Sequence, residues 1–384
     1  MEEPQPRNPQ TRPPKPLDDS RLDETHMTRA IELARAFHGR TAPNPLVGSV
    51  IVRNGEIVAE GAHRGLGGRH AEREALAQAG SQARGATVYV TLEPCSHFGR
   101  TGPCAQALID AGVARVVIGA LDPNPLVAGA GLKLLQMAGI ETEVGVCAEA
   151  ARAILAPFAQ KMQTGRPWFH GKWAMSADGK SASVSGDSRW ISSQASRDWV
   201  HGMRGKVDLV LTASGTVLAD DPLLNARPAG KRTPARALLD RRGRSSPDCR
   251  LARSIAEGPV LLITSPASDR SWRQAWRARG AEVLTVDDGV TAVSQLAASR
   301  GWTEIWVEGG GGLLGSLFAR NWIDEVHVFI GPKIVGGVRA AGPVGDPGAF
   351  TMAQAKALQL VESERMGPDL RLRYRIGKEP GNLT

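Results

Sequence analysis

The sequence contains few cysteines, few aromatic residues and no long apolar run. Its four cysteines, Cys95, Cys104, Cys147 and Cys249, are too few and too scattered among 384 residues for a disulfide framework, so metal binding or burial is favoured. No apolar stretch approaches the ~20 residues that a membrane-spanning helix needs. Aromatic residues make up 5% of the chain and are not interleaved with the basic residues, which disfavours a surface that stacks nucleic-acid bases.

The first 22 residues are rich in proline and polar groups. Such a segment cannot bury enough apolar surface to offset the loss of conformational entropy, so we expect a disordered tail over residues 1–22. The segment lacks the apolar region of a signal peptide and the arginine- and serine-rich amphipathic pattern of a transit peptide. The expected location is therefore the cytoplasm.

The length and charge of the chain bear on its organisation and its partner. One hydrophobic core rarely organises more than about 250–300 residues, so 384 residues predict two domains. The net charge of +8 suits an anionic partner, either a nucleic acid or a phosphorylated small molecule. Composition alone does not choose between these two classes.

Residues 23–165 show the alternation of an α/β domain. Apolar residues at helical spacing begin at Glu24, and a hairpin is predicted over residues 46–61, where Asn54-Gly55 tolerates the positive φ of a type I′ turn. A helix over residues 70–79 is followed by strands that alternate with helices. This order predicts a sheet with helices threaded between its strands.

Residues 166–384 form a second predicted α/β domain. The helical periodicity lapses over residues 161–168, a basic stretch marked by glycine and proline, and the boundary is placed there. No internal repeat relates the two halves. Seven short apolar runs beyond the boundary are expected to be strands: "WFHGKWAMS", "VDLVLTAS", "ARALLD", "PVLLIT", "EVLTV", "EIWVEGG" and "DEVHVFI".

One histidine and two cysteines in the first domain have the pattern of a catalytic zinc site. His70 and Glu72 begin a predicted helix, and Cys95 and Cys104 follow a predicted strand. A set of three ligands leaves a fourth position for water, whose pKa zinc lowers to about 7. Glu72, which is not a ligand, is suited to carry a proton to departing ammonia. A lone histidine at a helix start is more often structural, but H-x-E followed by P-C is typical of zinc nucleobase deaminases.

The cysteine spacing and the flanking motifs narrow the family. Base deaminases in general have C-x-x-C, whereas here "SHFGRTGP" separates the two cysteines. With "TLEPC", "TAPNPLVGSVIV" and "LDPNPLVAGAG", the chain resembles the deaminase domain of the bifunctional riboflavin biosynthesis proteins, which join a diaminohydroxyphosphoribosylaminopyrimidine deaminase to a 5-amino-6-(5-phosphoribosylamino)uracil reductase. Gly102 stands where that family usually has proline, which loosens a loop without changing a ligand.

Residues 304–318 contain a predicted strand, four glycines and a predicted helix. Backbone N–H groups at such a helix start attract phosphate, and Gly310, Gly312 and Gly315 match G-x-G-x-x-G. The match is weak as a dinucleotide fingerprint, because it lies late in the chain and lacks an acidic residue about 20 positions further on. A glycine-rich connection without a ligand is the alternative.

The second half also resembles the bifunctional family. "KWAMSADGKSA", "GDSRWIS", "TVLADDPLLNAR" and "VEGGGG" occur in the order of its reductase domain, which is similar in fold to dihydrofolate reductase. Two arginines suit a phosphate, and an indole offers a flat face to a nicotinamide. The resemblance implies cofactor contacts by Ala174, Trp190, Thr216, Asp220, Arg241, Gly310, Gly311, Gly312, Leu313, Leu314, Gly315 and Ser316, and substrate contacts by Ser188, Arg204, Leu224, Arg227 and Glu308.

Several implied residues have a simpler interpretation when taken singly. Trp190 alone would more often be a core residue, and Asp220 belongs to a common turn sequence. Asn44 and the "SHFGR" loop would meet the pyrimidine and ribose phosphate, yet Asn44 also suits a turn, and Arg100 a solvated loop. Arg241 replaces a cofactor-contacting serine of the family and is either a reader of a 2′-phosphate or a solvated charge; in the second case Arg242, Arg244 or the glycine-rich turn would read the phosphate.

The resemblance implies a bifunctional enzyme of riboflavin synthesis with a cytidine-deaminase-like zinc domain and a dihydrofolate-reductase-like domain. We expect one zinc ion per deaminase domain, NADPH as reductant, phosphorylated pyrimidines as substrates, and no nucleic-acid or membrane partner. A nucleic-acid base deaminase gives no reason for the second half, and a sensor with structural zinc needs a fourth protein ligand, which is not evident. The sequence does not give the oligomeric state or the residue that donates a proton during the reduction. Lys172 is a candidate for that proton donor by its strand position.

Overall fold

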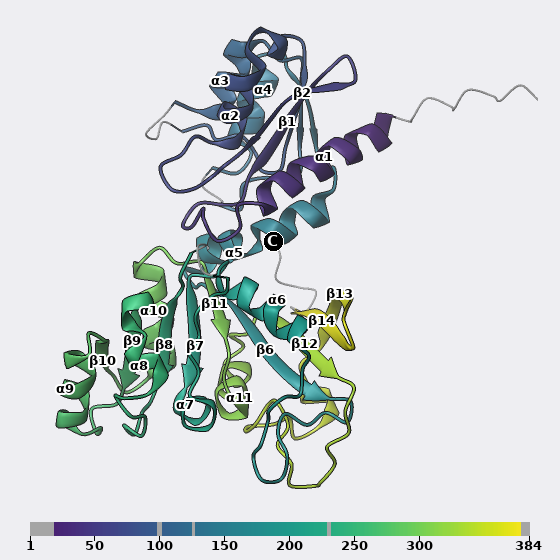
Figure 1. Ribbon diagram of the computed structural model, residues 1–384. Coiled ribbons are helices and arrows are strands. Elements are labelled where there is room, and N and C mark those ends of the chain that lie inside the picture. Colours follow the sequence, from purple (N-terminus) through teal and green to yellow (C-terminus); the bar gives the residue numbers. More distant parts are fainter. Residues whose placement is uncertain (1–18, 98–101, 125–126, 229–231, 378–384) are drawn as a thin grey trace, which may run out of the picture. The chain divides into compact units, whose positions relative to one another are not determined.

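The structure is a computed structural model that describes residues 19–97, 102–124, 127–228 and 232–377 (Figure 1). The chain divides into two compact units. The amino-terminal unit comprises the chain up to Ala36, Val47–His63 and Arg69–Ala153, and the carboxy-terminal unit comprises Phe37–Leu46, Arg64–Gly68 and the chain from Ile154. Each unit contains a sheet with helices, which confirms the predicted fold class of two α/β domains.

The predicted tail, residues 1–22, contains the start of a helix. Helix α1 (Asp19–Arg35) begins inside the predicted tail, and residues 1–18 of that tail lie outside the described residues. Asp23, in the second turn of α1, is buried and accepts hydrogen bonds from the Tyr89 hydroxyl at 2.6 Å and from Arg115 at 2.9 and 2.8 Å. These hydrogen bonds anchor the second turn of α1 and thereby stabilise its first turn. The amino-acid composition alone did not indicate that a helix begins here.

The division between the units also differs from the predicted boundary at residue 165. It falls between Ala153 and Ile154, inside helix α5 (Ala148–Thr164). The apolar periodicity continues from Ala153 to Ile154, so the sequence carries no local signal of the division.

The sheet of the amino-terminal unit has the order β2-β1-β3-β4-β5. β1 (Gly48–Arg53) pairs antiparallel with β2 (Glu56–Ala62) and with β3 (Thr87–Val90), while β4 (Arg115–Ile118) and β5 (Glu141–Val144) continue it in parallel. The predicted hairpin turn is present, since Asn54 and Gly55 have φ angles of 53° and 81°.

Helices pack closely on this sheet. A Cβ atom on Gly48 would lie 1.9 Å from the Ala30 carbonyl oxygen of α1, and one on Gly61 would lie 2.2 Å from the Ala71 carbonyl oxygen of the next helix. Glycine at these two positions therefore allows helix backbones to approach the strands. Besides α1 and α5, the helices of this unit are α2 (Ala71–Ala79), the 3₁₀ turn η1 (Gly80–Ala83), α3 (Cys104–Ala111) and α4 (Ala130–Met137).

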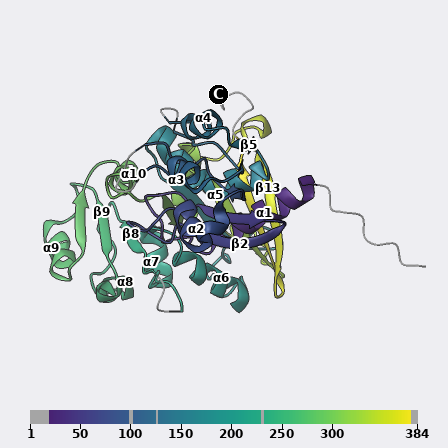
Figure 2. The ribbon, with the colours of Figure 1, turned by 90° about the horizontal axis from the view of Figure 1, so that it is seen from above.

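The sheet of the carboxy-terminal unit has nine strands in the order β10-β9-β8-β7-β11-β6-β12-β14-β13. The strands are parallel from β10 to β12, and β12, β14 and β13 pair antiparallel. Their bounds are β6 (Trp168–Ser176), β7 (Leu209–Ala213), β8 (Ala235–Leu239), β9 (Val260–Thr264), β10 (Glu282–Thr285), β11 (Glu304–Val307), β12 (Glu325–Gly331), β13 (Leu358–Met366) and β14 (Asp369–Ile376). The views in Figures 1 and 2 place β9 and β13 toward opposite edges of this sheet.

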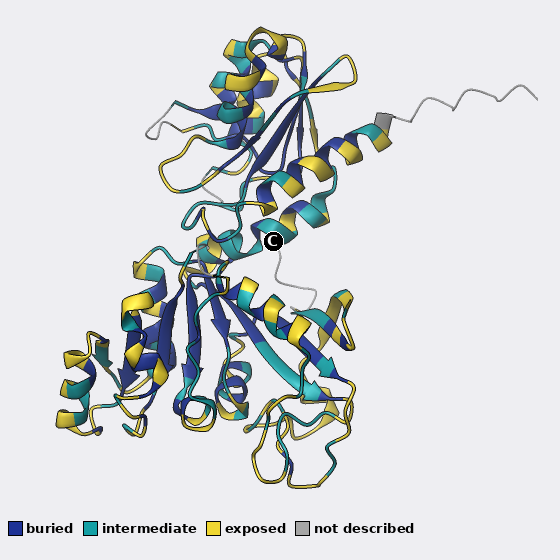
Figure 3. Cartoon of the chain, viewed as in Figure 1, coloured by how far each residue is buried: buried dark blue, intermediate teal, exposed yellow. Residues whose placement is uncertain are grey.

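Helices cover both faces of the parallel strands, which are mostly buried (Figure 3). One face packs on residues such as Val293 and Leu314, and the other on residues such as Val217 and Trp276. Strands buried on both faces have nearly continuous apolar sequences, which explains why they were predictable. The helices are α6 (Gln194–Arg204), α7 (Ser214–Asp220), α8 (Arg250–Arg253), α9 (Arg270–Ala278), α10 (Gly289–Ser299) and α11 (Gly311–Ala319), with 3₁₀ turns η2 (Ile255–Glu257) and η3 (Met352–Gln354).

Within the described ranges, no helix combines the length and the apolar character needed to cross a membrane. The cytoplasmic location stays a prediction.

Candidate active sites

Two helix starts and the loop after β3 bring three candidate metal ligands together. His70 is the N-cap residue of α2, Cys104 is the first residue of α3, and Cys95 lies in the loop. The His70 Nδ1 atom is 3.6 Å from Cys95 Sγ and 3.3 Å from Cys104 Sγ. In a tetrahedral zinc site with a Zn–N distance of about 2.1 Å and a Zn–S distance of about 2.3 Å, these atoms lie about 3.6 Å apart. The donor set and its spacing therefore fit a zinc ion.

The ionisation of these side chains also suits a metal site. A hydrogen bond from Cys104 lowers the pKa of Cys95 to about 4 despite burial, with His70 acting in the same direction. That hydrogen bond and burial raise the pKa of Cys104, and the hydrogen bond to Cys95 raises the pKa of His70 despite burial. A metal competes with the protons on Cys104 and His70, so its affinity for these residues depends on pH.

Glu72 lies beside this cluster in the first turn of α2. Its side chain is buried, at 3% exposure. Burial raises the pKa of Glu72 to about 7, although His70 and a hydrogen bond to Cys104 act in the opposite direction. A carboxyl group with a pKa near neutrality can both take up and release a proton at physiological pH, as a general acid and base must.

Backbone contacts hold the loop that carries the cysteines. The Cys104 amide donates to Cys95 Sγ at 3.3 Å. The Arg73 guanidinium donates twice to the Gly102 carbonyl, at 3.1 and 2.7 Å, so the glycine that departs from the family pattern is held by its backbone. Arg100 and the rest of residues 98–101 lie outside the described residues.

The carboxy-terminal unit contains a cleft of about 1100 Å³ beside the carboxyl ends of β7 and β11. Strand ends of this kind are the usual binding edge of an α/β sheet, and the volume exceeds the roughly 300–1,000 Å³ of a typical small-ligand pocket. The cleft therefore has room for a large cofactor together with a substrate. Of the predicted residues, Ala174, Ser188, Trp190, Arg204, Thr216, Asp220, Leu224, Arg227, Glu308, Gly310, Gly311, Gly312 and Leu313 line it.

A charged cluster lies in the wall of the cleft. Arg204 donates to Glu308 from Nε at 2.5 Å and from Nη2 at 2.8 Å, and Lys172 Nζ is 4.0 Å from Glu308 Oε2. Burial would raise the pKa of Glu308, but the charge and hydrogen bonds of Arg204 lower it to about 2. Burial lowers the pKa of Lys172 against the attraction of Glu308. A lysine in this setting releases its proton more readily than a solvated one.

Four predicted cofactor residues do not line the cleft: Arg241, Leu314, Gly315 and Ser316. Leu314 is fully buried in the core, and a Cβ atom on Gly315 would lie 2.4 Å from the Asp346 carbonyl oxygen, so both residues serve packing. Arg241 is exposed. Of the glycine motif, only the first residues line the cleft, and cofactor binding by this turn stays a prediction.

Sequence reasoning missed several residues that do line the cleft, among them His201, Ser214 and Arg250, and it named Arg244 only as an alternative to Arg241. Arg244 lies three residues after Arg241 and donates to Ser214 Oγ at 2.8 Å. Burial and the nearby charges of Arg204 and Arg227 lower the pKa of His201, which favours a neutral imidazole. The "DRRGR" segment predicted a cationic site, but the sequence does not show which of its arginines lines the cleft.

Comparisons with known proteins agree with both sites. The cytidine and deoxycytidylate deaminase zinc-binding region matches residues 20–120, and the RibD C-terminal domain matches residues 167–372. The chain is 41% identical to the riboflavin biosynthesis protein RibD of Synechocystis, over 90% of this chain and 94% of that protein. It is 40% identical to RibD of Escherichia coli, over 91% of this chain and 98% of that protein. The chain belongs to the RibD family.

Solved structures of the RibD family have the same two-domain fold. RibD from Acinetobacter baumannii aligns with a TM-score of 0.81 at 37% identity, covering 94% of this chain and 100% of that structure. A diaminohydroxyphosphoribosylaminopyrimidine deaminase/5-amino-6-(5-phosphoribosylamino)uracil reductase from Thermotoga maritima aligns with a TM-score of 0.82 at 34% identity, over the same shares of the two chains. The predicted family, and its union of a deaminase with a reductase in riboflavin biosynthesis, are confirmed.

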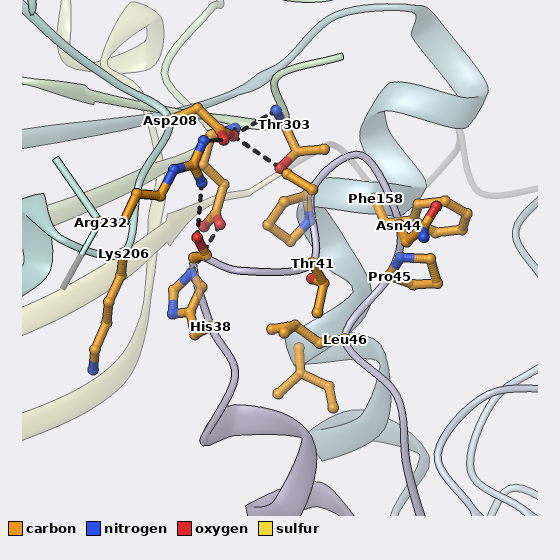
Figure 4. A pocket seen from close by; sticks show the side chains of 15 residues that line it. His38, Thr41, Asn44, Pro45, Leu46, Phe158, Lys206, Asp208, Arg232 and Thr303 are labelled. Atoms are coloured by element: carbon orange, nitrogen blue, oxygen red, sulfur yellow. Dashed lines mark hydrogen bonds and ion pairs between the residues drawn. The ribbon is translucent and has the colours of Figure 1, made fainter. Parts of the chain in front are cut away.

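Asn44, which resemblance to the RibD family linked to the substrate, lines a small pocket in the carboxy-terminal unit (Figure 4). Asp208 in this pocket accepts hydrogen bonds from Thr303 N at 2.8 Å and from Arg232, whose Nη1 atom donates to the Gly39 carbonyl at 2.9 Å. The pocket volume of about 20 Å³ accommodates roughly one water molecule and no pyrimidine. The role of Asn44 in substrate binding stays a prediction.

A second group with the donor atoms of a metal site is His170, Glu325 and His327, all buried in the sheet of the carboxy-terminal unit. His170 has carboxylate oxygens at both ring nitrogens, Glu304 at 3.1 Å and Glu325 at 3.5 Å. Burial lowers the pKa of His170, but these two carboxylates raise it to about 9. Each ring nitrogen of His170 therefore already has a carboxylate partner, and we interpret the group as an ion pair network.

Proposed function

We propose that the amino-terminal unit hydrolyses 2,5-diamino-6-ribosylamino-4(3H)-pyrimidinone 5′-phosphate, removing the 2-amino group as ammonia. The observation that carries this proposal is the buried, protonatable Glu72 beside a histidine and two cysteines at zinc-ligand spacing. His70, Cys95 and Cys104 would hold a zinc ion, which would lower the pKa of a water molecule at the site. Glu72 would take a proton from water as the water oxygen bonds to the carbon that bears the amino group, and would give that proton to the amino group as the carbon–nitrogen bond breaks and ammonia leaves.

We further propose that the carboxy-terminal unit reduces the deaminated product, 5-amino-6-(5-phosphoribosylamino)uracil, with NADPH. A hydride passes to the sugar carbon that bears the amine, a proton is taken up, and the ribosyl group becomes ribityl. Lys172 is the candidate proton donor, because it lies half-buried in the cleft wall and is 4.0 Å from a carboxylate that stays charged. Arg227 and Arg204 line the same cleft and suit the substrate phosphate.

We base the expected preference for NADPH over NADH on arginines of the cleft that have no carboxylate partner. Among the hydrogen bonds and ion pairs described for this chain, neither Arg244 nor Arg250 has a side-chain contact with a carboxylate, although both line the cleft with Thr216. The 2′-phosphate of NADPH is a dianion that an arginine binds through paired hydrogen bonds, whereas NADH offers only hydroxyl groups there. We therefore propose Arg244, in place of Arg241, as the reader of this phosphate.

One assay tests both activities. Zinc-loaded protein is given the diaminopyrimidine substrate, and ammonia release is followed together with NADPH oxidation. We expect ammonia without NADPH and oxidation only after deamination. Absence of ammonia release from protein with a full zinc content would contradict the deaminase. Salt-dependent retention on single-stranded DNA or RNA, in the absence of either activity, would instead support a nucleic-acid base deaminase.

A further inference from the structure

Glu93, in the "TLEPC" segment, is a buried carboxylate with four backbone partners. Its Oε2 atom accepts hydrogen bonds from the amides of Asp122 at 3.1 Å and Gly129 at 2.9 Å. Its Oε1 atom accepts from the amides of Gly131 at 2.9 Å and Leu132 at 3.2 Å. These donors lie at the two ends of the loop between β4 and α4, so the Glu93 side chain binds both ends of the loop.

The same loop is packed tightly against the backbone next to Glu93. The Glu93 amide donates to the Ala120 carbonyl at 2.9 Å, which ties the ends of β3 and β4 together. A Cβ atom on Gly131 would lie 1.9 Å from the Pro94 carbonyl oxygen and 3.3 Å from Glu93 Oε1. Any side chain at residue 131 would push the start of α4 away from the carboxylate. The Glu93 carboxylate and the missing side chain of Gly131 are therefore both needed for the same contact between this loop and the start of α4.

The loop held by this contact lies next to the candidate zinc ligands. Glu93 is two residues before Cys95. Asp122, at the start of the loop, is close enough to Cys95 and His97 for their charges to act on its carboxyl group. The side chains that follow β4 are thus placed beside the cluster by hydrogen bonds that Glu93 accepts.

We propose that Glu93 is a positioning residue of the deaminase, whose carboxylate fixes Asp122 and residues 129–132, at the two ends of the segment after β4, as a wall of the pyrimidine site. This inference rests on the proposed deaminase function. Only a carboxylate serves here, because each oxygen accepts from two amides, whereas glutamine would turn an NH₂ group toward two N–H donors. Both oxygens of Glu93 are occupied by backbone amides in this role, which distinguishes it from Glu72.

Two variants disturb the contact from opposite sides. Glu93→Gln removes one acceptor, and Gly131→Ala displaces the loop while leaving the carboxylate intact. We expect each to retain one zinc per chain and to raise KM for ammonia release roughly tenfold or more, with a smaller change in kcat. We also expect faster amide hydrogen exchange in peptides that cover residues 120–132. Because both changes break one contact, the double variant should be little worse than either single variant.

Ile51→Val is the matched control, since it trims a buried side chain of the same sheet in β1 and leaves the loop alone. A rise in KM of similar size in Ile51→Val would show that general destabilisation is the cause and would overturn the proposal. Unchanged exchange over residues 120–132 in Glu93→Gln, or additive effects in the double variant, would also overturn it. If the wild-type protein releases no ammonia, the proposed function fails, whereas the exchange measurement still decides whether Glu93 holds the loop.

Discussion

Glu72 is the side chain whose alteration most directly tests the chemistry of the amino-terminal unit. Glu72→Gln preserves the shape of the side chain but removes its ability to carry a proton. We expect full zinc content and a loss of about 10²–10⁴-fold in kcat for ammonia release, the usual effect of losing a general acid and base. Metal analysis and an ammonia assay on the same preparation check this. Near wild-type release would remove Glu72 from the mechanism.

Arg244 and Arg241 form a matched pair, because both belong to one basic segment and only Arg244 lines the cleft. Arg244→Ala should reduce the preference for NADPH over NADH roughly tenfold or more, since a hydrogen bond to a charged group contributes ~1.5–3 kcal/mol. Arg241→Ala should leave the preference unchanged. The measurement is kcat/KM with each cofactor, and a loss of preference in Arg241→Ala alone would restore the sequence-based assignment.

Single residues were predictable where chemistry dictates their spacing. His70, Cys95 and Cys104 were named because a zinc site requires those side chains in that order, and the fold brings their ligand atoms within 4.8 Å. The choice between Arg241 and Arg244 depends on which side of a turn faces the cleft, and the sequence does not show this. Glu93 was overlooked because its partners are backbone amides, which any residue except proline supplies.

At the scale of strands, the ion pair network across β11, β6 and β12 gives the carboxy-terminal unit a pH-dependent stability. The folded-state pKa of His170 is about 9, above the unfolded value near 6.5. Its contribution is therefore complete below about pH 6.5 and is lost as the pH rises through 9. We expect the free energy of unfolding of this unit to fall by about 1–3 kcal/mol over that range.

Urea unfolding of the wild type and of His170→Asn at several pH values between 6 and 10 checks this prediction. The variant should be less stable at pH 6.5 and should approach the wild type near pH 10. A constant difference across the series would mean that His170 does not gain a proton on folding, and the network would then need another explanation.

Strand prediction failed where charge alternates with apolar residues. The seven parallel strands of the carboxy-terminal unit were predicted, because most of them are buried and their sequences are rich in apolar residues. β13 and β14 were missed, although "DLRLRYRI" alternates as a strand with one solvated face does. Their arginines pair across the sheet, as Arg371 does with Glu362 at 2.6 Å, and such pairing is a tertiary contact that a search for apolar runs overlooks.

At the scale of the whole molecule, the two activities should be separable by metal loss. Cys104→Ser replaces a thiolate with a neutral hydroxyl, so we expect zinc content and ammonia release to fall together. NADPH oxidation should persist when the deaminated substrate is supplied, because the cleft belongs entirely to the other unit. Full zinc content in this variant would show that Cys104 is not a ligand.

The carboxy-terminal unit includes Phe37–Leu46 from the first part of the chain, and His38 in that segment is 2.8 Å from Glu304 of β11. A gene that encoded the reductase alone, starting at residue 154, would omit this histidine. Glu304 would keep His170 as a partner and lose His38, and Arg232 would lose the Gly39 carbonyl. A separately encoded reductase of this sequence would thus need residues 37–46, or other residues in their place, to keep these contacts.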